Sequence, residues 1–273
     1  MFKLSIRTIL SHKRRLLSTV VSIVLGVAFL VGTFVFTDSL QRTFDDLFSS
    51  VYRNTDVVVR SSEEIDLGQG QSSRGRIPDS LLATVRAVPG VSSASGSVTG
   101  YARIIGTDGK PLGTDRGSPN FGMDISDEAV SVWKIREGRV PTNGTEMAMD
   151  AGAYADGGFA IGDQVAVVSQ RGSRTFTLVG VVGFGSADSP VGSKVALFDL
   201  ATAQDFVGQA GQLDDIMARS DGSIGQTELA ARVAAAMPPT GTETLTGQQM
   251  ADDSSNQVKT SLGAIPGPVQ VWS

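Results

Sequence analysis

The feature that most constrains this chain is an uncharged apolar segment at residues 16–37, which reads LLSTVVSIVLGVAFLVGTFVFT. It contains no charged residue, no proline, no asparagine and no glutamine. A helix needs about 20 such residues to cross the ~30 Å hydrocarbon layer of a bilayer, whereas a helix in a globular core rarely runs this far without a polar face. We therefore expect a membrane-spanning helix over residues 16–37.

A cleaved signal peptide is the main alternative to a permanent anchor. The apolar region of such a peptide is usually about 7–15 residues long, and small residues follow it at the cleavage site. Here the apolar run is longer and closes with Phe34, Val35 and Phe36, where small residues would be needed. We expect the helix to remain as an anchor.

Charge is distributed unevenly about this segment. The charged residues before Asp38 are all basic, and they are Lys3, Arg7, Lys13, Arg14 and Arg15. Of the chain's 23 basic residues, the remaining 18 lie beyond the segment with all 28 acidic residues. By the positive-inside rule, we expect a cytoplasmic basic leader, residues 1–15, and an acidic outer part. A large acidic domain argues against nucleic acid as a partner.

An amphipathic pattern continues beyond the apolar segment. Apolar residues recur there at spacings of four, three and four, which predicts one stripe of a helix. These residues are Leu40, Phe44, Leu47 and Val51. We expect a stalk helix over residues 38–53 that extends the span, and its stripe needs a second helix as a partner.

The end of the chain supplies a candidate partner for this stripe. Thr246 and Gln249 have the spacing of a capping box, in which each side chain bonds the other residue's backbone N–H. A helix is therefore expected over residues 246–262, returning beside the first stalk helix. Its apolar residues on roughly one side are Met250, Val258 and Leu262. Residues 263–273 are expected to form an irregular tail, too short to cross a bilayer.

Residues 54–245 are expected to form the outer domain. The expected strands include residues 56–60, 146–150, 163–169, 174–184, 194–198 and 215–219, and the expected helices are residues 78–88, 200–207 and 225–237. Strands and helices mix without the strict alternation of a doubly wound sheet, which argues for an α+β fold. Residues 61–76 are rich in glycine, serine and glutamine and predict a flexible loop. Residues 146–150, EMAMD, predict an edge or half-buried strand.

The outer part of the chain lacks the side chains of several common catalytic sites. The chain has no cysteine, and its one histidine, His12, lies in the basic leader. Ser-His-Asp catalysis, Cys-His catalysis and histidine metal sites are therefore excluded from the outer domain. The P-loop pattern is also missing, so the chain cannot bind ATP in that way by itself. We expect no catalytic residue, no cofactor, no metal and no enzyme activity.

Acidic pairs remain as candidates for chemistry. Asp124 lies close in sequence to Asp127 and Glu128, and Asp214 precedes Asp215. Paired carboxylates can hydrolyse glycosides, which would make the chain an anchored hydrolase. A solvated acidic surface is the simpler interpretation, and we favour it.

Residues 136–182 carry the most specific pattern in the chain: REGRVPTNGTEMAMDAGAYADGGFAIGDQVAVVSQRGSRTFTLVGVV. Gly-Arg-x-Pro is followed by an acid before a strand that ends in Asp, a short helix, Ile-Gly-Asp before a strand, and a strand that ends in Val-Gly-Val. Together with the basic opening at residues 7–17, this resembles the MacB/FtsX-type ABC transporter permeases over about residues 1–262. The resemblance implies a periplasmic core domain of the MacB type. The motif positions, which look like turn and packing residues, are Gly138, Arg139, Pro141, Glu146, Asp150, Gly162, Asp163 and Gly180.

The resemblance also implies a function and partners. Such permeases have four transmembrane helices, with the outer domain between the first two, and work as dimers with an ABC-type ATPase subunit in the lipid of a bacterial cytoplasmic membrane. ATP-driven motion of the stalks moves the outer domains to expel substrates, release lipoproteins or activate cell-wall hydrolases. This chain departs from the pattern after Leu262 and resembles a permease truncated before its second transmembrane helix. The alternative is a membrane-tethered outer binding module without transport activity.

Overall fold

The computed structural model describes residues 13–68, 71–113, 120–125, 131–185, 187–190 and 192–263. The chain divides into two units, Met1–Leu47 and Phe48–Ser273. The described part mixes helices and strands in the α+β manner expected from the sequence.

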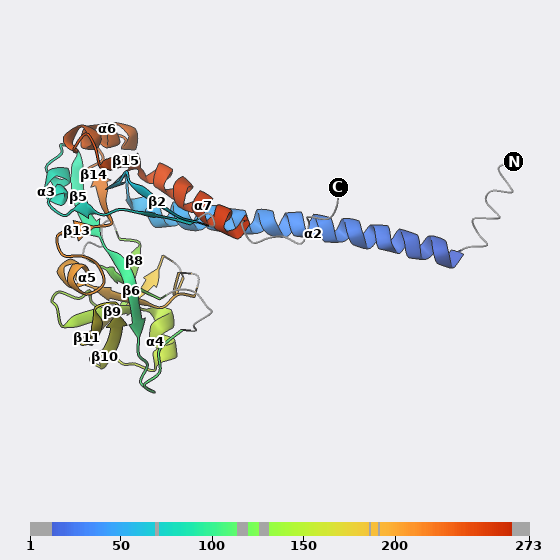
Figure 1. Cartoon of the computed structure of the whole chain (residues 1–273), viewed down its shortest axis with the longest axis horizontal. Helices are drawn as coiled ribbons and strands as arrows, with labels where there is room; N and C mark the ends of the chain where they lie inside the picture. The colour runs from blue at the N-terminus through green and yellow to red at the C-terminus, as the bar shows by residue number, and fades with distance from the viewer. Residues whose placement is uncertain are drawn as a thin grey trace. The chain divides into compact units, whose positions relative to one another are not determined.

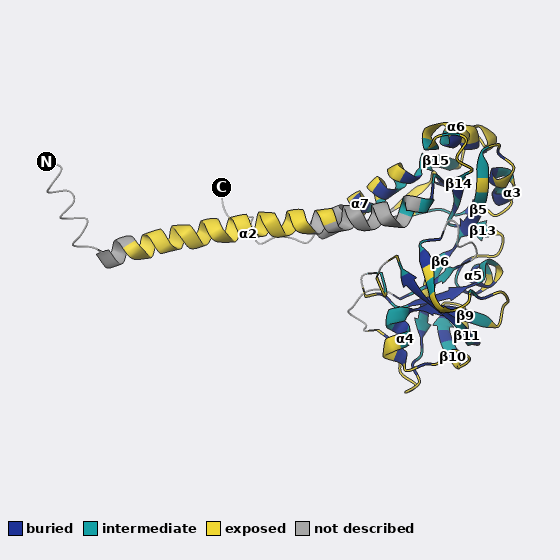
Figure 2. Cartoon of the chain, turned by 180° about the vertical axis from the view of Figure 1, so that it is seen from behind, coloured by how far each residue is buried: buried dark blue, intermediate teal, exposed yellow. Residues whose placement is uncertain are grey.

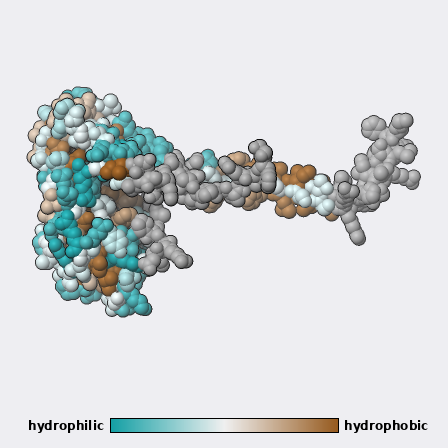
Figure 3. Space-filling model, viewed as in Figure 1, coloured by the Kyte–Doolittle hydropathy of each residue, from teal (hydrophilic) through white to brown (hydrophobic). Residues whose placement is uncertain are grey.

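Helix α2 (Lys13–Val51) carries the apolar segment in one unbroken run. Every side chain of residues 17–39 is exposed on its surface, as the yellow part of the helix in Figure 2 shows. Figure 3 shows that apolar residues, in brown, gather on this surface. Within the described residues, Leu17–Ser39 is the one segment long and apolar enough to cross a membrane, judged by length and composition. A continuous apolar surface of this kind marks a site of membrane or protein interaction.

Three hydroxyl groups within this segment are hydrogen-bonded to the helix itself. Ser22, Thr33 and Ser39 each donate a hydrogen bond to the backbone carbonyl four residues earlier, at 2.8–2.9 Å. A hydroxyl group in hydrocarbon without a partner would cost several kcal/mol. The hydroxyl groups of Ser22, Thr33 and Ser39 therefore need no further hydrogen-bond partner when this segment lies in lipid.

A four-stranded antiparallel sheet, called here the β1 sheet, begins the second unit. Its strand order is β15-β1-β14-β5, and helices α3 and α6 pack against it (Figure 1). The three valines of β1 are fully buried, because β1 lies between two other strands and under a helix. The elements are β1 (Val57–Ser61), β5 (Val91–Ser97), β14 (Asp215–Ser220), β15 (Thr242–Thr246), α3 (Leu81–Arg86) and α6 (Gln226–Ala236).

A ring of six strands, called here the barrel, forms the other part of the second unit. The strand order is β10-β6-β7-β12-β9-β11, the pairing of β10 with β11 closes the ring, and β8 adds to β11 from outside it. Helices α4 and α5 pack against the strands. The elements are β6 (Thr99–Ile104), β7 (Phe121–Asp124), β8 (Trp133–Gly138), β9 (Glu146–Asp150), α4 (Ala151–Gly157), β10 (Gln164–Ser169), β11 (Gly172–Phe184), β12 (Val195–Phe198) and α5 (Leu200–Phe206).

The remaining elements are short pieces and one longer helix. Turn η1 (Tyr52–Asn54) follows α2, and helix α7 (Gly247–Gly263) follows β15 directly. Strands β2 (Glu64–Gly68) and β3 (Gln71–Arg74) form a hairpin, while β4 (Ile77–Pro78) pairs with β13 (Gln212–Leu213).

One hydrophobic core joins the β1 sheet to the barrel. It runs from Val57 and Leu229 to the aromatic group of Phe176, Phe198 and Phe206, whose ring centroids lie 4.8–5.7 Å apart. Such spacings are typical of favourable aromatic contacts. The long strand β11 supplies Phe176 and pairs with β10 in the register expected for a hairpin, so the strand pair predicted at residues 163–184 is confirmed.

Two expectations about the strands were wrong. Residues 61–76 were expected to form a flexible loop but contain the β2–β3 hairpin, in which Glu64 and Arg74 face each other as an ion pair. Strand β9 is not an edge or half-buried strand, since it lies between β12 and β11. Its residues 147–150 are buried, and only its end residues carry charge.

Two glycines allow close approach of the backbone where β8 meets β11. Gly138 and Gly180 face each other in the register of the two strands. A Cβ atom on Gly180 would lie 2.1 Å from the carbonyl oxygen of Arg139, and one on Gly138 would lie 2.2 Å from that of Val179. Gly138 also has a φ of +73°, in the left-handed region that favours glycine. Both positions therefore require glycine for β8 and β11 to pair this closely.

We predict that Gly180→Ala lowers the free energy of unfolding by about 1–3 kcal/mol, because the added methyl group overlaps the backbone. Urea unfolding of the full chain in detergent, followed by the fluorescence of the buried Trp133, measures the change. Gly144→Ala is the matched control, since its Cβ meets no atom closer than the Thr202 hydroxyl at 3.4 Å, and it should change stability by less than about 1 kcal/mol. Equal stability of the two variants would contradict the close packing.

Candidate functional site

The start of the second unit and the start of α7 lie side by side. The backbone N–H of Gly247 donates to the carbonyl oxygen of Asp56 at 3.0 Å, and the side chains of Tyr52 and Ser254 are hydrogen-bonded. A Cβ atom on Gly247 would lie 1.9 Å from the carbonyl oxygen of Thr55, so only glycine fits there. The β1 sheet and the barrel are therefore inserted between two helical connections whose near ends touch.

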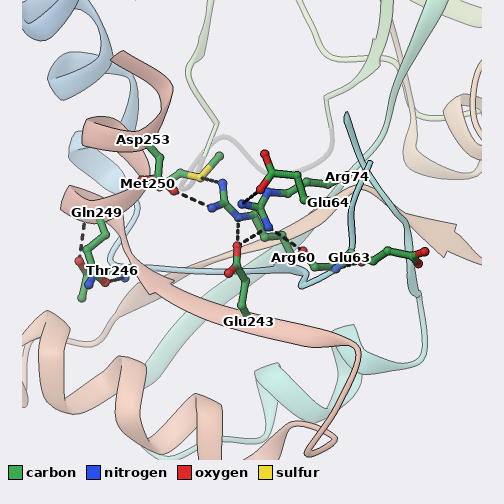
Figure 4. Close-up of polar contacts among 10 residues, drawn as sticks. Arg60, Glu63, Glu64, Arg74, Glu243, Thr246, Gln249, Met250 and Asp253 are labelled. Carbon is green, nitrogen blue, oxygen red and sulfur yellow. Dashed lines mark hydrogen bonds and ion pairs between the residues drawn. The ribbon is translucent and has the colours of Figure 1, made fainter. Parts of the chain in front are cut away.

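Helix α7 begins with the capping box predicted from the sequence. The Thr246 hydroxyl accepts from the backbone N–H of Gln249 at 3.2 Å, and the Gln249 side chain accepts from the backbone N–H of Thr246 at 2.8 Å. This reciprocal arrangement, visible at the left of Figure 4, satisfies two backbone donors. It fixes the point at which the strand β15 becomes a helix.

A buried arginine holds α7 to the β1 sheet. Arg60, at the end of β1, is only 8% exposed. Its Nε donates to Glu243 on β15 at 2.5 Å, and its Nη2 donates to Asp253 on α7 at 2.6 Å. The sulfur of Met250 lies 3.2 Å from Nη1. Figure 4 shows the guanidinium group between these three partners. We call this set of four residues the Arg60 joint.

The β2–β3 hairpin extends the joint. Arg74 reaches the same Glu243 carboxylate at 2.7 Å and pairs with Glu64 at 3.7 Å. Arg74 Nη1 also donates to the carbonyl oxygen of Ser61 at 3.1 Å. Glu243 therefore accepts from two arginines, and β1, β15, the hairpin and α7 are tied together by charge-assisted hydrogen bonds, which are among the stronger kinds in proteins.

A polar cleft of about 930 Å³ opens beside the Arg60 joint. Residues of β1, the hairpin, β14 and α7 line it. Among its charged residues, Arg60, Arg74 and Arg76 are each already paired with a carboxylate. The described residues contain no group of three or more acidic, histidine or cysteine side chains placed to hold a metal ion. The arginines that line the cleft thus serve to tie the surrounding elements to one another.

Asp124, Asp214 and Asp215 are half-buried and lie near one another, so these three acids do not form the open, solvated surface that we favoured. Asp124 is brought to Asp214 and Asp215 although about 90 residues separate them in the chain. Burial raises the pKa of Asp124 to about 7, and the charges of Asp215 and Asp214 add to this rise. Burial, and then the charge of Asp214, raise the pKa of Asp215 to about 7 as well. Asp127 and Glu128 lie outside the described residues.

The motif residues lie at turns and strand ends around β9. Arg139 and Glu146 form a two-bond ion pair at 2.7 and 2.6 Å, and Glu146 also accepts from the backbone N–H of Thr142. The bonds from Arg139 and Thr142 lower the pKa of Glu146 to about 2. Pro141 is buried beside this pair.

The other motif residues have comparable positions. Asp150 is the N-cap of α4 and accepts from the backbone N–H groups of Ala153 and Val195, at 3.0 and 2.6 Å. Asp163 accepts from the backbone N–H of Ala160 at 2.8 Å, in a turn where Gly162 has a φ of +100°. These contacts hold backbone in place, so the assignment of the motif residues to turns and packing is compatible with the fold.

The predicted stalk seam falls largely outside the described side chains. The side chains in question are those of Leu40, Phe44, Leu47, Val51, Val258 and Leu262. Of the seven seam residues, Met250 alone has a described side chain, and its sulfur contacts Arg60. The pairing of the two stripes therefore stays a prediction.

Sequence reasoning missed the Arg60 joint. The available signal was a single arginine that closes a run of three valines at residues 57–59. An arginine in that place must either reach solvent or find acids. Its partners, Glu243 and Asp253, lie more than 180 residues away in the sequence. No local sequence pattern could have predicted them.

We predict that Arg60→Met lowers the free energy of unfolding by about 1–3 kcal/mol, because Asp253 loses its cation and Glu243 keeps only Arg74 of its two arginines. Amide hydrogen exchange should also become faster in residues 247–257 of α7. Arg232→Met, which removes an exposed arginine paired with Glu228 on α6, is the control and should cost less than about 1 kcal/mol. Unchanged exchange in α7 would show that Arg60 does not hold the helix.

Comparison with known proteins agrees with this architecture. Residues 16–236 match the model of a family described as the MacB-like periplasmic core domain. Among solved structures, the periplasmic region of MacB from Actinobacillus actinomycetemcomitans is similar in fold at 12% identity and a TM-score of 0.53, over 75% of this chain and 95% of that one. The extracellular domain of the noncanonic ABC-type transporter YknZ from Gram-positive bacteria matches at 10% identity and a TM-score of 0.45, over 70% of this chain and 99% of that one.

No curated protein sequence gave a match. The family model nevertheless covers most of the chain, including the apolar segment, strands β1, β5 and β14 of the β1 sheet, and the barrel. The chain therefore belongs to the family of the MacB-like periplasmic core domain, which occurs in ABC-type transporter permeases.

Proposed function

We propose that the chain is a permease subunit of a MacB/FtsX-type ABC transporter, in which movement of membrane helices is passed to the second unit through the Arg60 joint. The observation that carries the proposal is the meeting of η1, β15 and α7 at one place. A domain inserted between two helices responds to a relative displacement of those helices. Membership of the family of the MacB-like periplasmic core domain supports a transporter role.

The proposed topology follows from the charge of the leader. The basic residues before the span favour a cytoplasmic N-terminus, and the second unit then lies outside the cytoplasmic membrane of a bacterium. The exposed apolar surface of Leu17–Ser39 supports contact with lipid. In this arrangement the subunit works beside a second copy of itself and with an ABC-type ATPase on the cytoplasmic side.

The energy for movement comes from the partner ATPase in this proposal. The chain has no P-loop pattern, and the chain itself is proposed to have no catalytic role. A helix transmits a displacement along its axis because each backbone carbonyl is bonded to an amide one turn away. Helix α7 spans 17 residues, and Arg60 attaches its first turns to the β1 sheet, so a pull on α7 is passed to the sheet.

The same geometry accommodates the alternative of a membrane-tethered binding module, and one experiment separates the two. The full chain is expressed with an ATPase encoded beside it, and the two are purified from membranes in detergent. The proposal predicts that the ATPase co-purifies, while an unrelated ATPase does not. It also predicts that addition of ATP changes amide exchange in α7, because the stroke reaches this helix.

The variant Arg60→Met sharpens this test. It should still co-purify with the ATPase, since the contact lies on the cytoplasmic side, yet the ATP-dependent change should no longer reach the β1 sheet. A chain that stays in the membrane fraction without any ATPase would contradict the transporter role and favour the tethered binding module.

A further inference from the structure

One of the connections between the β1 sheet and the barrel is only one residue long. Strand β5 ends at Ser97 in the β1 sheet and β6 begins at Thr99 in the barrel, which leaves Val98 as the link. Val98 is fully buried. The returning crossing packs directly on it, because a Cβ atom on Gly208 would lie 2.4 Å from the Val98 side chain. We call this buried one-residue connection the Val98 crossing.

One carboxylate from each part holds this crossing. Asp124, at the end of barrel strand β7, accepts from the backbone N–H of Val98 at 2.7 Å, and its own N–H donates to the Val98 carbonyl at 3.2 Å. Asp214, beside the first residue of β14, accepts from the backbone N–H of Thr99 at 2.5 Å. Its own N–H donates to the carbonyl of Ser97 at 2.8 Å. Asp124 and Asp214 therefore bond the backbone N–H groups of two consecutive residues, Val98 and Thr99.

A third acid completes the cluster. Asp215 lies in register with Ser97 on one side and with Arg60 on the other. Its Oδ1 is buried and has no hydrogen-bond partner among the described residues. The charges of Asp214 and Asp215 both act on Asp124, so the barrel and the β1 sheet face each other with like charge.

The cations around the cluster do not balance it. Arg76 is bound to Asp214 at 2.7 Å and also donates to the carbonyl of Thr99. Arg60 faces Asp215 from β1 but is already shared by Glu243 and Asp253. The phenol of Tyr52, from η1, also faces Asp215 and is neutral at ordinary pH. Of the two arginines near the three carboxylates, only Arg76 is not also shared with acids outside the cluster.

We propose that Asp124 and Asp215, beside the ion pair of Asp214 with Arg76, form a proton-operated hinge that sets the angle between the β1 sheet and the barrel. When Asp124 and Asp215 are protonated, the hydrogen bonds of Asp124 and Asp214 to the backbone of Val98 and Thr99 hold the two parts together. When the two protons leave, Asp124 on the barrel is repelled by Asp214 and Asp215 of the β1 sheet, and this hold on the Val98 crossing loosens. The device needs no partner protein and is independent of the proposed transport role.

The direction of the pH effect follows from the acids' burial. The pKa values of Asp124 and Asp215 are raised from 3.8 to about 7 in the folded chain. A raised pKa means that the folded form binds the proton more tightly than the unfolded form, so the stability gained is fully present below pH 3.8 and is lost as pH rises to about 7. The hinge should therefore respond between about pH 6 and pH 8.

The test measures the distance between the two parts in the full chain in detergent micelles. The chain has no cysteine, so Ser173→Cys on β11 and Ala235→Cys on α6 give two specific sites for spin labels. Both positions are exposed. Pulsed electron resonance at pH 5 to pH 9 should show the distance distribution shifting with a midpoint near pH 7.

Two variants locate the cause of the shift. In the double variant Asp124→Asn with Asp215→Asn, the distance should stay at the value found at pH 5 and lose its pH dependence. Asp205→Asn removes an exposed acid that pairs with Arg174 on the barrel surface and should leave the shift unchanged. If the double variant does not fold, Asp124→Asn alone should reduce the shift by at least half.

Two outcomes overturn the proposal. The first is a distance distribution that does not change from pH 5 to pH 9 in the labelled chain with all three acids present. The second is a shift that persists in the folded double variant. The first outcome can be observed without any substitution of Asp124, Asp214 or Asp215, so it does not depend on whether the double variant folds.

Discussion

The arrangement of the second unit depends on where the charge of Arg60 is satisfied. A guanidinium group that is almost fully buried must be paired, because an isolated charge in the interior is very costly. Arg60 meets this requirement with one acid from β15 and one from α7. The direction in which α7 leaves the sheet follows from this pairing together with the capping box at Thr246. The cleft beside the Arg60 joint is the space between α7, the β2–β3 hairpin and strands β1 and β14.

The Arg60 joint and the acidic cluster are neighbours in one row of the β1 sheet. Arg60, Asp215 and Ser97 are partners across β1, β14 and β5, and Ser97 directly precedes the Val98 crossing. A displacement of α7 that moved the guanidinium group would change the field on Asp215. The row thus connects helix α7 to the Val98 crossing by electrostatic interactions over a few ångströms.

The sequence predicted the features that rest on local patterns. The apolar helix, the β10–β11 hairpin, helix α6 and the capping box at Thr246 depend on residues close together in the chain, and all were found. The Arg60 joint and the clustering of Asp124 with Asp215 were not predicted, because their partners lie about 90 to 190 residues apart and no periodic pattern connects them. The β2–β3 hairpin was missed because its glycine and serine content hid a cross-strand ion pair.

The central claim is that Arg60 couples α7 to the β1 sheet, and a double-mutant cycle tests it most directly. Arg60→Met, Asp253→Asn and their combination are compared in the full chain by their free energies of unfolding. The account predicts that the two changes are not additive, with a coupling free energy of about 1–3 kcal/mol. Additive effects, with a coupling indistinguishable from zero, would contradict it and would leave the attachment of α7 to its capping box, the Gly247–Asp56 hydrogen bond and its packing on η1, β1 and β15.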